Sequence, residues 1–347
     1  MSPLITRKSS DDSKSAELAA PQGILLDPAG APALRAAPLS SVVRTVAAAA
    51  HGRLPSVLPA FPQGLQDLGV AAALRITGPE RESWLQGVQT NDLRCAPEGG
   101  AVEALFLGGK GRIVAEGLVF RYRDEIVVTT LADRLDALQA HLDGLLIMED
   151  AEVSRALGLR RLRYMPGDRP PAAPGLDDAA SSLPLGAELL VAEARAQELL
   201  AALPQRPAPE AVEALRVALG VPAWRRDFDE STTPLEAGLD RAISFTKGCY
   251  VGQEVVAMAT YRGRVQWNLV RLEVKGPAPA AGSAIDPARG GKGRVTSAVQ
   301  VGDFALLLGM VHRDKIVPEA KVQLEDGREA TVLGLPFGSR PGAGVCV

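Results

Sequence analysis

A single thiol stands among charged residues and glycines near residue 250. The stretch reads Lys247-Gly248-Cys249-Tyr250-Val251-Gly252-Gln253-Glu254. We expect a helix to open near Gly252. The partial positive charge of a helix N-terminus and the cation of Lys247 both favour the thiolate of Cys249. Two interpretations remain open: Cys249 is an accessible, activated thiol, or it is a small buried hydrophobe beside Tyr250, because free cysteines are commonly buried.

The polar residues and glycines of this octapeptide also have alternative roles. Lys247, Gln253 and Glu254 either bind a ligand or tie the loop to neighbouring segments, and the sequence favours neither role. Glycine allows backbone angles and close approaches that a side chain forbids. We therefore interpret Gly248 and Gly252 as backbone requirements before ligand contacts.

The octapeptide resembles the signature of YgfZ-type folate-binding proteins, which are relatives of the T-protein (aminomethyltransferase) of the glycine cleavage system. Other segments occur in the same order as in that family, so the resemblance covers roughly residues 65–347. These segments are Ile76-Thr77-Gly78-Pro79, Trp84-Leu85-Gln86-Gly87, Thr90-Asn91-Asp92, Arg216 with Gly220-Val221-Pro222, Pro234-x-Glu236, Ser244-Phe245, and Gly293-Arg294-Val295-Thr296-Ser297. The octapeptide is the specific part of the match.

The resemblance implies a folate-binding accessory protein that supports assembly or repair of iron–sulfur clusters in client enzymes, including tRNA-modifying ones. It implies tetrahydrofolate or a related folate as cofactor, and iron–sulfur assembly or client proteins as partners. Cys249 would be the key side chain, and Glu116 occupies the place of a catalytic acid. The candidate cofactor-binding residues are Arg216, Lys247, Gly248, Tyr250, Gly252, Gln253 and Glu254.

Three positions depart from the family pattern. Ala218 stands where the T-protein relatives carry a glutamate for the pterin, Ala115-Glu116 replaces a pair of aspartates, and Met258 replaces an arginine found in many members. Aminomethyl transfer requires a carboxylate near the reactive nitrogen, so the first two changes argue against that activity. The alternatives are a tetrahydrofolate-dependent aminomethyltransferase or demethylase, and a scaffold of the same fold that binds no small molecule.

The composition narrows the class of protein. The chain of 347 residues is long enough for two or three domains, and its net charge of −3 provides no global basic field for direct DNA binding. Three widely spaced cysteines predict no disulfide framework and suit a reducing cytoplasm. We find no Cys/His cluster that predicts a metal site, no run long enough for a membrane span and no secretory pattern. We therefore expect a cytoplasmic protein without a membrane association.

The hydrophobic pattern predicts an α+β fold with two mixed units around a central cleft. The first unit has a ferredoxin-like β-α-β-β-α-β order. Its strands are predicted at 70–76, 102–107, 112–121, 125–130 and 150–154, and its helices at 79–88 and 131–147. The second unit has helices at 192–203 and 209–219, strands near 188 and 243, and a short helix over 252–261.

The last part of the chain predicts a small antiparallel β-barrel, closed so that no strand edge remains. Its strands are expected at 265–274, 292–299, 304–312, 320–325 and 328–334. A change of alternation at Leu269-Val270 predicts a bulge, and Asp326-Gly327 predicts a hairpin turn. The expected domains are a flexible extension over 1–64, a ferredoxin-like folate-binding unit over 65–165, a linker over 166–186, a second α+β unit with the octapeptide over 187–263, and the barrel over 264–347.

Overall fold

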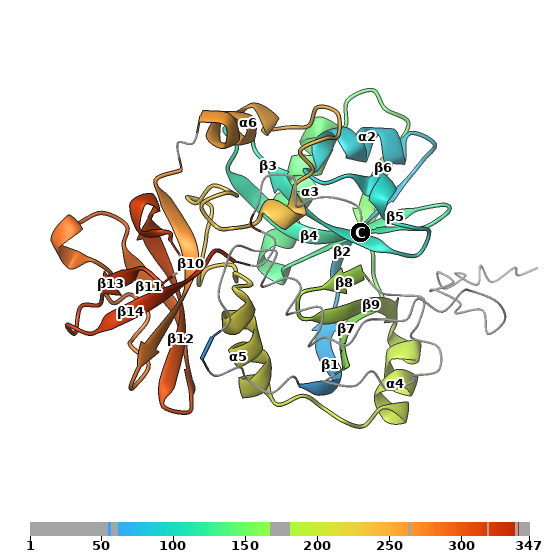
Figure 1. Cartoon of the computed structure of the whole chain (residues 1–347). Helices are drawn as coiled ribbons and strands as arrows, with labels where there is room; N and C mark the ends of the chain where they lie inside the picture. The colour runs from blue at the N-terminus through green and yellow to red at the C-terminus, as the bar shows by residue number, and fades with distance from the viewer. Residues whose placement is uncertain are drawn as a thin grey trace, which may run out of the picture.

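The computed structural model describes residues 55–56, 62–166, 181–262, 265–317, 319–336 and 339. Over these residues the chain is a mixed α+β fold with three antiparallel sheets and few helices (Figure 1). Most of the expected extension over 1–64 and residues 167–180 of the expected linker lie outside the described residues.

The first sheet is formed by the segment with the ferredoxin-like pattern. Its strands are β2 (Ala72–Thr77), β3 (Ala101–Leu107), β4 (Ile113–Arg121), β5 (Ile126–Thr130) and β6 (Glu152–Arg155), in the order β3-β4-β5-β2-β6. Helices α2 (Arg81–Val88) and α3 (Leu135–Leu145) cover one face, where Ile76 packs with Leu85 and Leu138. The predicted elements are confirmed, but β5 gives the sheet one strand more than the β-α-β-β-α-β order contains.

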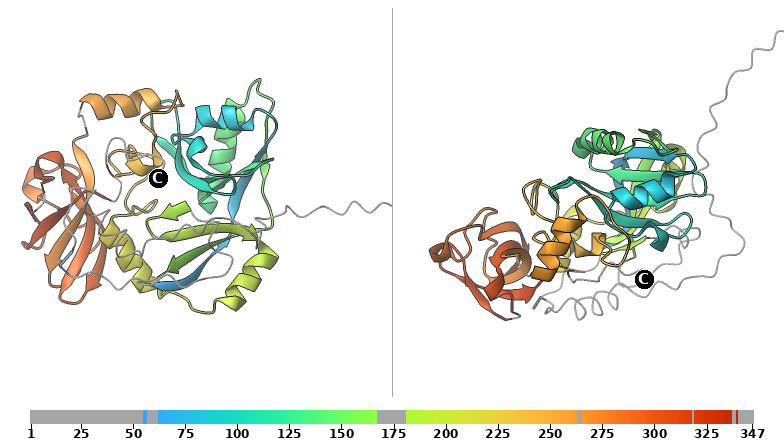
Figure 2. Two further views of the ribbon diagram at one scale, coloured as in Figure 1. Left: turned by 45° about the vertical axis from the view of Figure 1, so that its right-hand side comes forward. Right: turned by 90° about the horizontal axis from the view of Figure 1, so that it is seen from above.

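A second sheet takes its strands from both sides of the first unit. β1 (Gln63–Val70) precedes that unit in the chain, whereas β7 (Leu159–Pro166), β8 (Ser181–Leu183) and β9 (Gly186–Ala192) follow it, and their order is β1-β7-β9-β8. Helix α4 (Glu193–Ala202) covers the outer face through Leu199. On the inner face Leu190 packs with Phe120 of the first sheet. The result is a stack of helices, sheet, sheet and helix (Figure 2).

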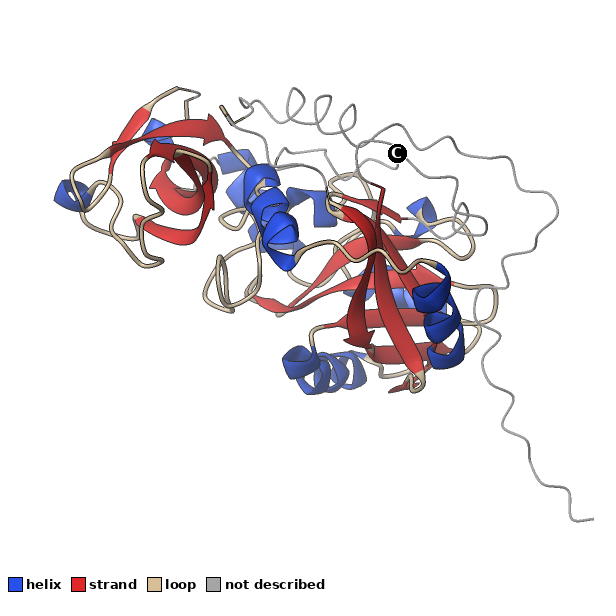
Figure 3. Cartoon of the chain, turned by 90° about the horizontal axis from the view of Figure 1, so that it is seen from below, coloured by secondary structure: helices blue, strands red, loops and turns tan. Residues whose placement is uncertain are grey.

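The third sheet contains the C-terminal strands and lies to one side of the stack (Figure 3). It consists of β10 (Trp267–Lys275), β11 (Arg294–Val301), β12 (Phe304–His312), β13 (Lys321–Gln323) and β14 (Glu329–Gly334), in the order β11-β12-β10-β14-β13. The predicted hairpin at Asp326-Gly327 joins β13 to β14. The register of β10 against β14 shifts between Arg271 and Leu272, close to the predicted bulge.

The third sheet is not closed by strand pairing among the described residues. Its edge strands are β11 and β13, and no ladder joins them. The segment before β11 spans the gap instead, since Ala284 forms an isolated bridge with Arg294 and Ile285 forms one with Leu324. The expected closed barrel is thus replaced by an open sheet whose edges are connected through two single bridges.

Helix α5 (Pro209–Leu219) connects the stack to the third sheet. Leu215 and Leu219 pack with Met165 of the second sheet, and the opposite side of the helix packs against β10, β11 and β12. Gly220 ends the helix in the left-handed conformation with φ 76°, which suits glycine. The helix bounds agree with the sequence prediction.

A buried ion pair fixes this connection. Arg216 donates through Nη1 to Asp227 Oδ2 at 2.7 Å and through Nη2 to Ser297 Oγ at 2.7 Å. Asp227 is 1% exposed and also accepts hydrogen bonds from the hydroxyls of Thr296 and Ser297 on β11. The carboxylate therefore joins α5, the loop after it and the third sheet.

The segment between α5 and the octapeptide contains one departure from the prediction. The strand expected near residue 243 is not formed, because η3 (Asp240–Ala242) ends at Ile243 and the next residue makes a single backbone contact, from Ser244 N to Thr90 O. Helix α6 (Gln253–Arg262) begins with the last two residues of the octapeptide, next to the predicted start near Gly252.

We expect Asp227→Ala to lower the free energy of unfolding by about 3 kcal/mol, since it leaves the Arg216 guanidinium buried without one of its two carboxylate partners. Urea unfolding at neutral pH measures this loss. Glu198→Gln serves as control, because the pair between Arg195 and Glu198 is exposed and contributes about 0.5 kcal/mol or less. Equal stabilities of the two variants would contradict the proposed connection.

Candidate functional site

The octapeptide forms a loop whose anchors are buried and whose thiol is exposed. Lys247 and Tyr250 are buried, whereas Gly248 and Cys249 are exposed, and Cys249 is a free cysteine. Tyr250 packs with Ile243 and Leu107, and burial raises the pKa of its phenol to about 12. The alternative of a buried, hydrophobic Cys249 is therefore wrong, and the thiol is open to reagents and partners.

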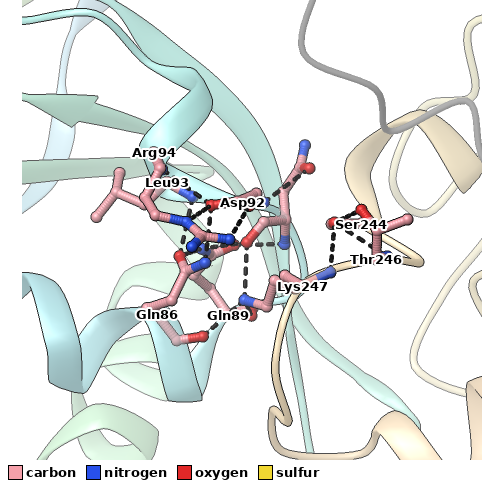
Figure 4. A network of polar contacts seen from close by, with 9 residues as sticks. Gln86, Gln89, Asp92, Leu93, Arg94, Ser244, Thr246 and Lys247 are labelled. Carbon is pink, nitrogen blue, oxygen red and sulfur yellow. Dashed lines mark hydrogen bonds and ion pairs between the residues drawn. The ribbon is translucent and has the colours of Figure 1, made fainter.

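Lys247 holds the loop on the C-terminal end of α2 (Figure 4). Its Nζ donates to the backbone carbonyls of Gln86 at 2.6 Å, Gln89 at 2.5 Å and Asn91 at 2.7 Å. The last carbonyls of a helix have no partner within the helix, and a cation there also interacts favourably with the helix dipole. All three N–H bonds of the ammonium are used in this way, so Lys247 fulfils the second role that the sequence left open: it ties the loop to its neighbour.

Burial lowers the pKa of Lys247 to about 7, and the nearby carboxylate of Asp92 acts in the opposite direction. Three acceptors require three N–H donors, which only the protonated amine provides. The hydrogen bonds thus favour the charged form at the site where burial disfavours it. The ammonium also lies 5.1 Å from the centroid of the Tyr250 ring, within the range of a cation–π interaction.

Backbone hydrogen bonds extend the attachment along the loop. Ser244 N donates to Thr90 O, Val251 N donates to Gly87 O, and Thr90 Oγ1 donates to Ala242 O. The segment after α2 is itself fixed by side chains, since Gln86 Nε2 donates to Asp92 Oδ1 (Figure 4). The thiol is therefore presented from a loop with a fixed backbone.

The two glycines of the octapeptide differ in role. Gly252 has φ 82°, and a Cβ there would lie 2.9 Å from Leu107 Cβ, so this position requires glycine as predicted. At Gly248 no atom lies within 4 Å of an added Cβ. Gly248 is thus not a packing requirement, and its backbone next to Cys249 is open to a close approach by another molecule.

The remaining candidates of the octapeptide lie at the start of α6. Gln253 and Glu254 form the first turn, where an acidic residue suits the helix dipole, and Glu254 is exposed. Met258 is 39% exposed on the same helix. The side chains of the next two arginines in the sequence, Arg262 and Arg264, lie outside the described residues.

Arg216 does not join the octapeptide site. Its guanidinium is engaged by Glu213, Asp227, Ser297 and the carbonyl of Val221. Burial acts to lower its pKa, but the surrounding carboxylates raise it above the ordinary value. The structure therefore assigns Arg216 to the connection between α5 and the third sheet.

Glu116 lies on the inner face of the first sheet, between the two stacked sheets. Its neighbour Ala115 is buried on the opposite face under α2 and α3, because successive strand residues point to opposite faces. Burial raises the pKa of Glu116 to about 7, although Arg241 acts to lower it. Part of the side chain remains accessible to solvent. Glu116 is thus a deep carboxyl that solvent still reaches, which is typical of a functional site.

Arg241 and Glu103 form an ion pair that acts on Glu116 electrostatically. Arg241 Nε donates to Glu103 Oε2 at 2.6 Å. Its Nη1 is buried and has no hydrogen-bond partner. A buried guanidinium N–H without a partner is costly unless a ligand or water accepts its hydrogen bond.

The second sheet contributes a matching charged group to the same region. Arg161 and Arg163 of β7 both bind Glu188 of β9, at 2.6 Å and 2.5 Å. Arg163 Nε is buried without a partner. We name the six residues between the sheets the polar centre: Glu103, Glu116, Arg161, Arg163, Glu188 and Arg241. Sequence reasoning missed five of them and predicted no strand over 159–166, although the alternation Arg161-Leu162-Arg163 is a usable signal of a strand with one charged face.

A separate hollow of about 180 Å³ lies where α6, η3 and the third sheet meet. Its lining includes Asp240, Thr260 and Asn268, but neither Cys249 nor Glu116. Burial raises the pKa of Asp240 to about 6. The hollow is therefore distinct from both the thiol loop and the polar centre.

Three further observations concern metal binding, disulfide bonding and membrane-spanning helices. No group of three His, Cys, Asp or Glu side chains in the described residues is arranged to hold a metal ion. Cys95 is disulfide-bonded, although the number and spacing of the cysteines predicted no disulfide framework. None of the helices in the described segments is both long and apolar enough to cross a lipid bilayer.

Comparison with known proteins relates this architecture to a family. No family model matches the chain. The aminomethyltransferase T of the glycine cleavage system from Bartonella henselae has a similar structure, with a TM-score of 0.59 and 15% identity over 86% of this chain and 96% of that one. The three antiparallel sheets thus form an aminomethyltransferase-like fold.

Sequence comparison identifies more specific relatives than the shared fold does. The tRNA-modifying protein YgfZ of Yersinia enterocolitica is 26% identical over 307 residues, which cover 80% of this chain and 93% of the relative. The mitochondrial iron-sulfur cluster assembly factor IBA57 of Homo sapiens is 28% identical over 239 residues, which cover 60% of this chain and 66% of the relative. Together with the octapeptide, these similarities support a YgfZ-type protein with an aminomethyltransferase-like fold.

We expect Lys247→Met to lower the free energy of unfolding by about 2–4 kcal/mol, because it removes the Lys247 donor from three backbone carbonyls, of which Asn91 O keeps a hydrogen bond from Gln89 Nε2. The loop should also lose its side-chain attachment to α2, so alkylation of Cys249 by iodoacetamide should change in rate. Lys110→Met is the matched control, since Lys110 is exposed on the turn between β3 and β4. A Met variant as stable as the control would show that the three hydrogen bonds do not hold the loop.

The pKa of Glu116 predicts a pH-dependent stability. Between pH 4.5 and 7 the folded state keeps a proton on Glu116 that the unfolded state has released, so this residue reduces stability as the pH rises. At about 1.4 kcal/mol per pKa unit, the reduction reaches about 3 kcal/mol. Urea unfolding measures the free energy of unfolding of Glu116→Gln and of the protein with Glu116. The difference in favour of Glu116→Gln should be larger at pH 8 than at pH 5. A stability difference that does not change with pH would contradict this.

Proposed function

We propose that this YgfZ-type protein is a folate-binding accessory protein that supports assembly or repair of iron–sulfur clusters in client enzymes, including tRNA-modifying ones. Cys249 is the residue that acts on the client. The observation that carries the proposal is the exposed thiol on a loop held by the buried Lys247. The names of the relatives, a tRNA-modifying protein and an iron-sulfur cluster assembly factor, support the same direction.

The geometry around the thiol suits action on a macromolecule. Cys249 is exposed and Gly248 beside it has open space, so a protein surface can approach without displacing side chains. A thiolate is a soft ligand that binds iron–sulfur clusters. A fixed backbone keeps the sulfur in one position, which lowers the ordering cost of each encounter.

The polar centre is our candidate site for the folate. A tetrahydrofolate has a pterin with hydrogen-bond donors and acceptors along one edge, and an anionic glutamate tail. Glu116 offers a carboxyl for the pterin edge, and Arg241 Nη1 and Arg163 Nε are buried donors without partners. These groups fit a planar polar ligand, and when bound the folate would supply a one-carbon carrier or a structural ligand at this place.

The runner-up is a tetrahydrofolate-dependent aminomethyltransferase or demethylase. The raised pKa of Glu116 favours it, because a carboxyl that titrates near neutral pH suits proton transfer. The two positions at which acids are missing speak against it. Ala115 is buried in the core under α2 and α3, and Ala218 is buried against the third sheet.

Genetic rescue tests the role of Cys249. In a strain that lacks the gene, we expect iron–sulfur enzyme activity to fall, the unmodified gene to restore it, and Cys249→Ala to fail. Thr246→Ala is the matched control, because Thr246 is exposed in the same loop and should permit rescue. Full rescue by Cys249→Ala would remove the thiol from the function.

Calorimetric titration with tetrahydrofolate tests the polar centre. We expect binding to the unmodified protein and a dissociation constant about tenfold higher or more for Glu116→Gln, which loses a charged hydrogen-bond partner. Glu198→Gln, an exposed change on α4, should bind as the unmodified protein does. No binding to the unmodified protein would favour the ligand-free scaffold, and ammonia release from an aminomethyl-lipoyl carrier would favour the transferase.

A further inference from the structure

Two adjacent apolar side chains are largely exposed to solvent on the turn between α3 and β6. Ile147 is 82% exposed and Met148 is 90% exposed. The other large hydrophobic residues exposed in the described segments, Val70, Leu157, Met258 and Val317, are isolated in the sequence. Single exposed hydrophobic residues are normal at a protein surface, whereas contiguous exposed apolar side chains are a feature of interaction sites.

The turn is held in a fixed shape. The carboxylate of Glu149 accepts hydrogen bonds from the backbone N of Met148 at 3.1 Å and of Ile147 at 3.2 Å. These backbone donors lower the pKa of Glu149. At the far end, Asp150 N donates to Glu80 Oε2, and Glu80 N donates to Asp150 O. The two apolar side chains are therefore presented on an ordered backbone.

Exposed acidic residues flank this apolar pair in the chain. Residues 143–152 contain the exposed carboxylates of Asp143, Glu149, Asp150 and Glu152, and they contain no Lys or Arg. We name residues 143–152 the acidic knob. An apolar centre with a charged rim is the arrangement of a protein–protein contact site, in which the centre contributes affinity and the rim contributes orientation and rate.

We propose that the acidic knob inserts Ile147 and Met148 into an apolar pocket framed by Lys and Arg on a partner protein. The charge selects this occupant, because four carboxylates repel nucleic acid and anionic lipid. A second copy of the chain would bring its own carboxylates against the first set. The proposal goes beyond the proposed function and requires neither the thiol nor a folate.

Site-specific photo-cross-linking tests the contact in cells of the source organism. The photoreactive amino acid p-benzoylphenylalanine is placed at position 148, or, as control, at position 157, where Leu157 is 78% exposed. We expect an adduct with one protein at 148 that is absent at 157. That protein is then purified and titrated with the full-length chain.

Two double variants separate the apolar and the charged contributions. The double variant Ile147→Ser and Met148→Ser should raise the dissociation constant for the cross-linked partner protein at least tenfold at any salt concentration. Asp143→Asn with Glu152→Gln should weaken binding at low salt and reduce its salt dependence, because these side chains are the parts of the rim that do not hold the turn. Circular dichroism and thermal unfolding check that both variants fold.

Several results would overturn the proposal. They are equal adducts at 148 and 157, an adduct with RNA, lipid or a second copy of the chain, and an affinity that neither double variant changes. These experiments measure binding at the acidic knob. Their outcome is therefore independent of the genetic rescue test of Cys249 and of the folate titration.

Discussion

The ammonium of Lys247 on three backbone carbonyls is the interaction on which the thiol loop depends. It joins the loop before α6 to the end of α2, segments separated by about 160 residues in the chain, and it does so in a buried position. A buried cation is costly unless all of its donors are satisfied. Here the end of α2 and the segment after it supply the three carbonyls, so one side chain satisfies its own donors and holds the loop on the helix end. The exposure of Cys249 follows, since the anchors on either side of it point inward.

Much of the fold follows from local patterns in the sequence. The helix over α3 is indicated by leucines at helical spacing, and β5 by a β-branched run from Ile126 to Thr130. Pairings between distant segments do not follow from such patterns. β1 pairs with β7 across the whole first unit, and the third sheet depends on two bridges from Ala284 and Ile285 in a segment without regular pattern. A closed barrel was for this reason the wrong extrapolation from correctly predicted strands.

The same division applies to the candidate site. The octapeptide could be identified from sequence because its residues are adjacent, and Gly252 could be assigned because the left-handed conformation requires glycine. The acceptors of Lys247 could not be predicted, since they are backbone atoms that carry no residue signature. The polar centre was also hidden, because its members come from β3, β4, β7, β9 and η3 and meet only when the two sheets stack. Arginine and glutamate in a strand otherwise suggest an exposed face.

The alternation of strand residues explains why the loss of one acid at 115 and the retention of one at 116 have different consequences. Ala115 points toward α2 and α3, where an aspartate would be buried among apolar side chains, whereas Glu116 points toward the second sheet and its arginines. The chain therefore keeps a carboxyl on the only face of β4 that borders the polar centre. Ala218 is also buried in an apolar interface, since it lies on the side of α5 that packs against the third sheet. The two alanines remove charge from apolar interfaces without removing it from the centre. The chain thus retains a deep carboxyl at Glu116, while the acid pair expected of a transferase is absent.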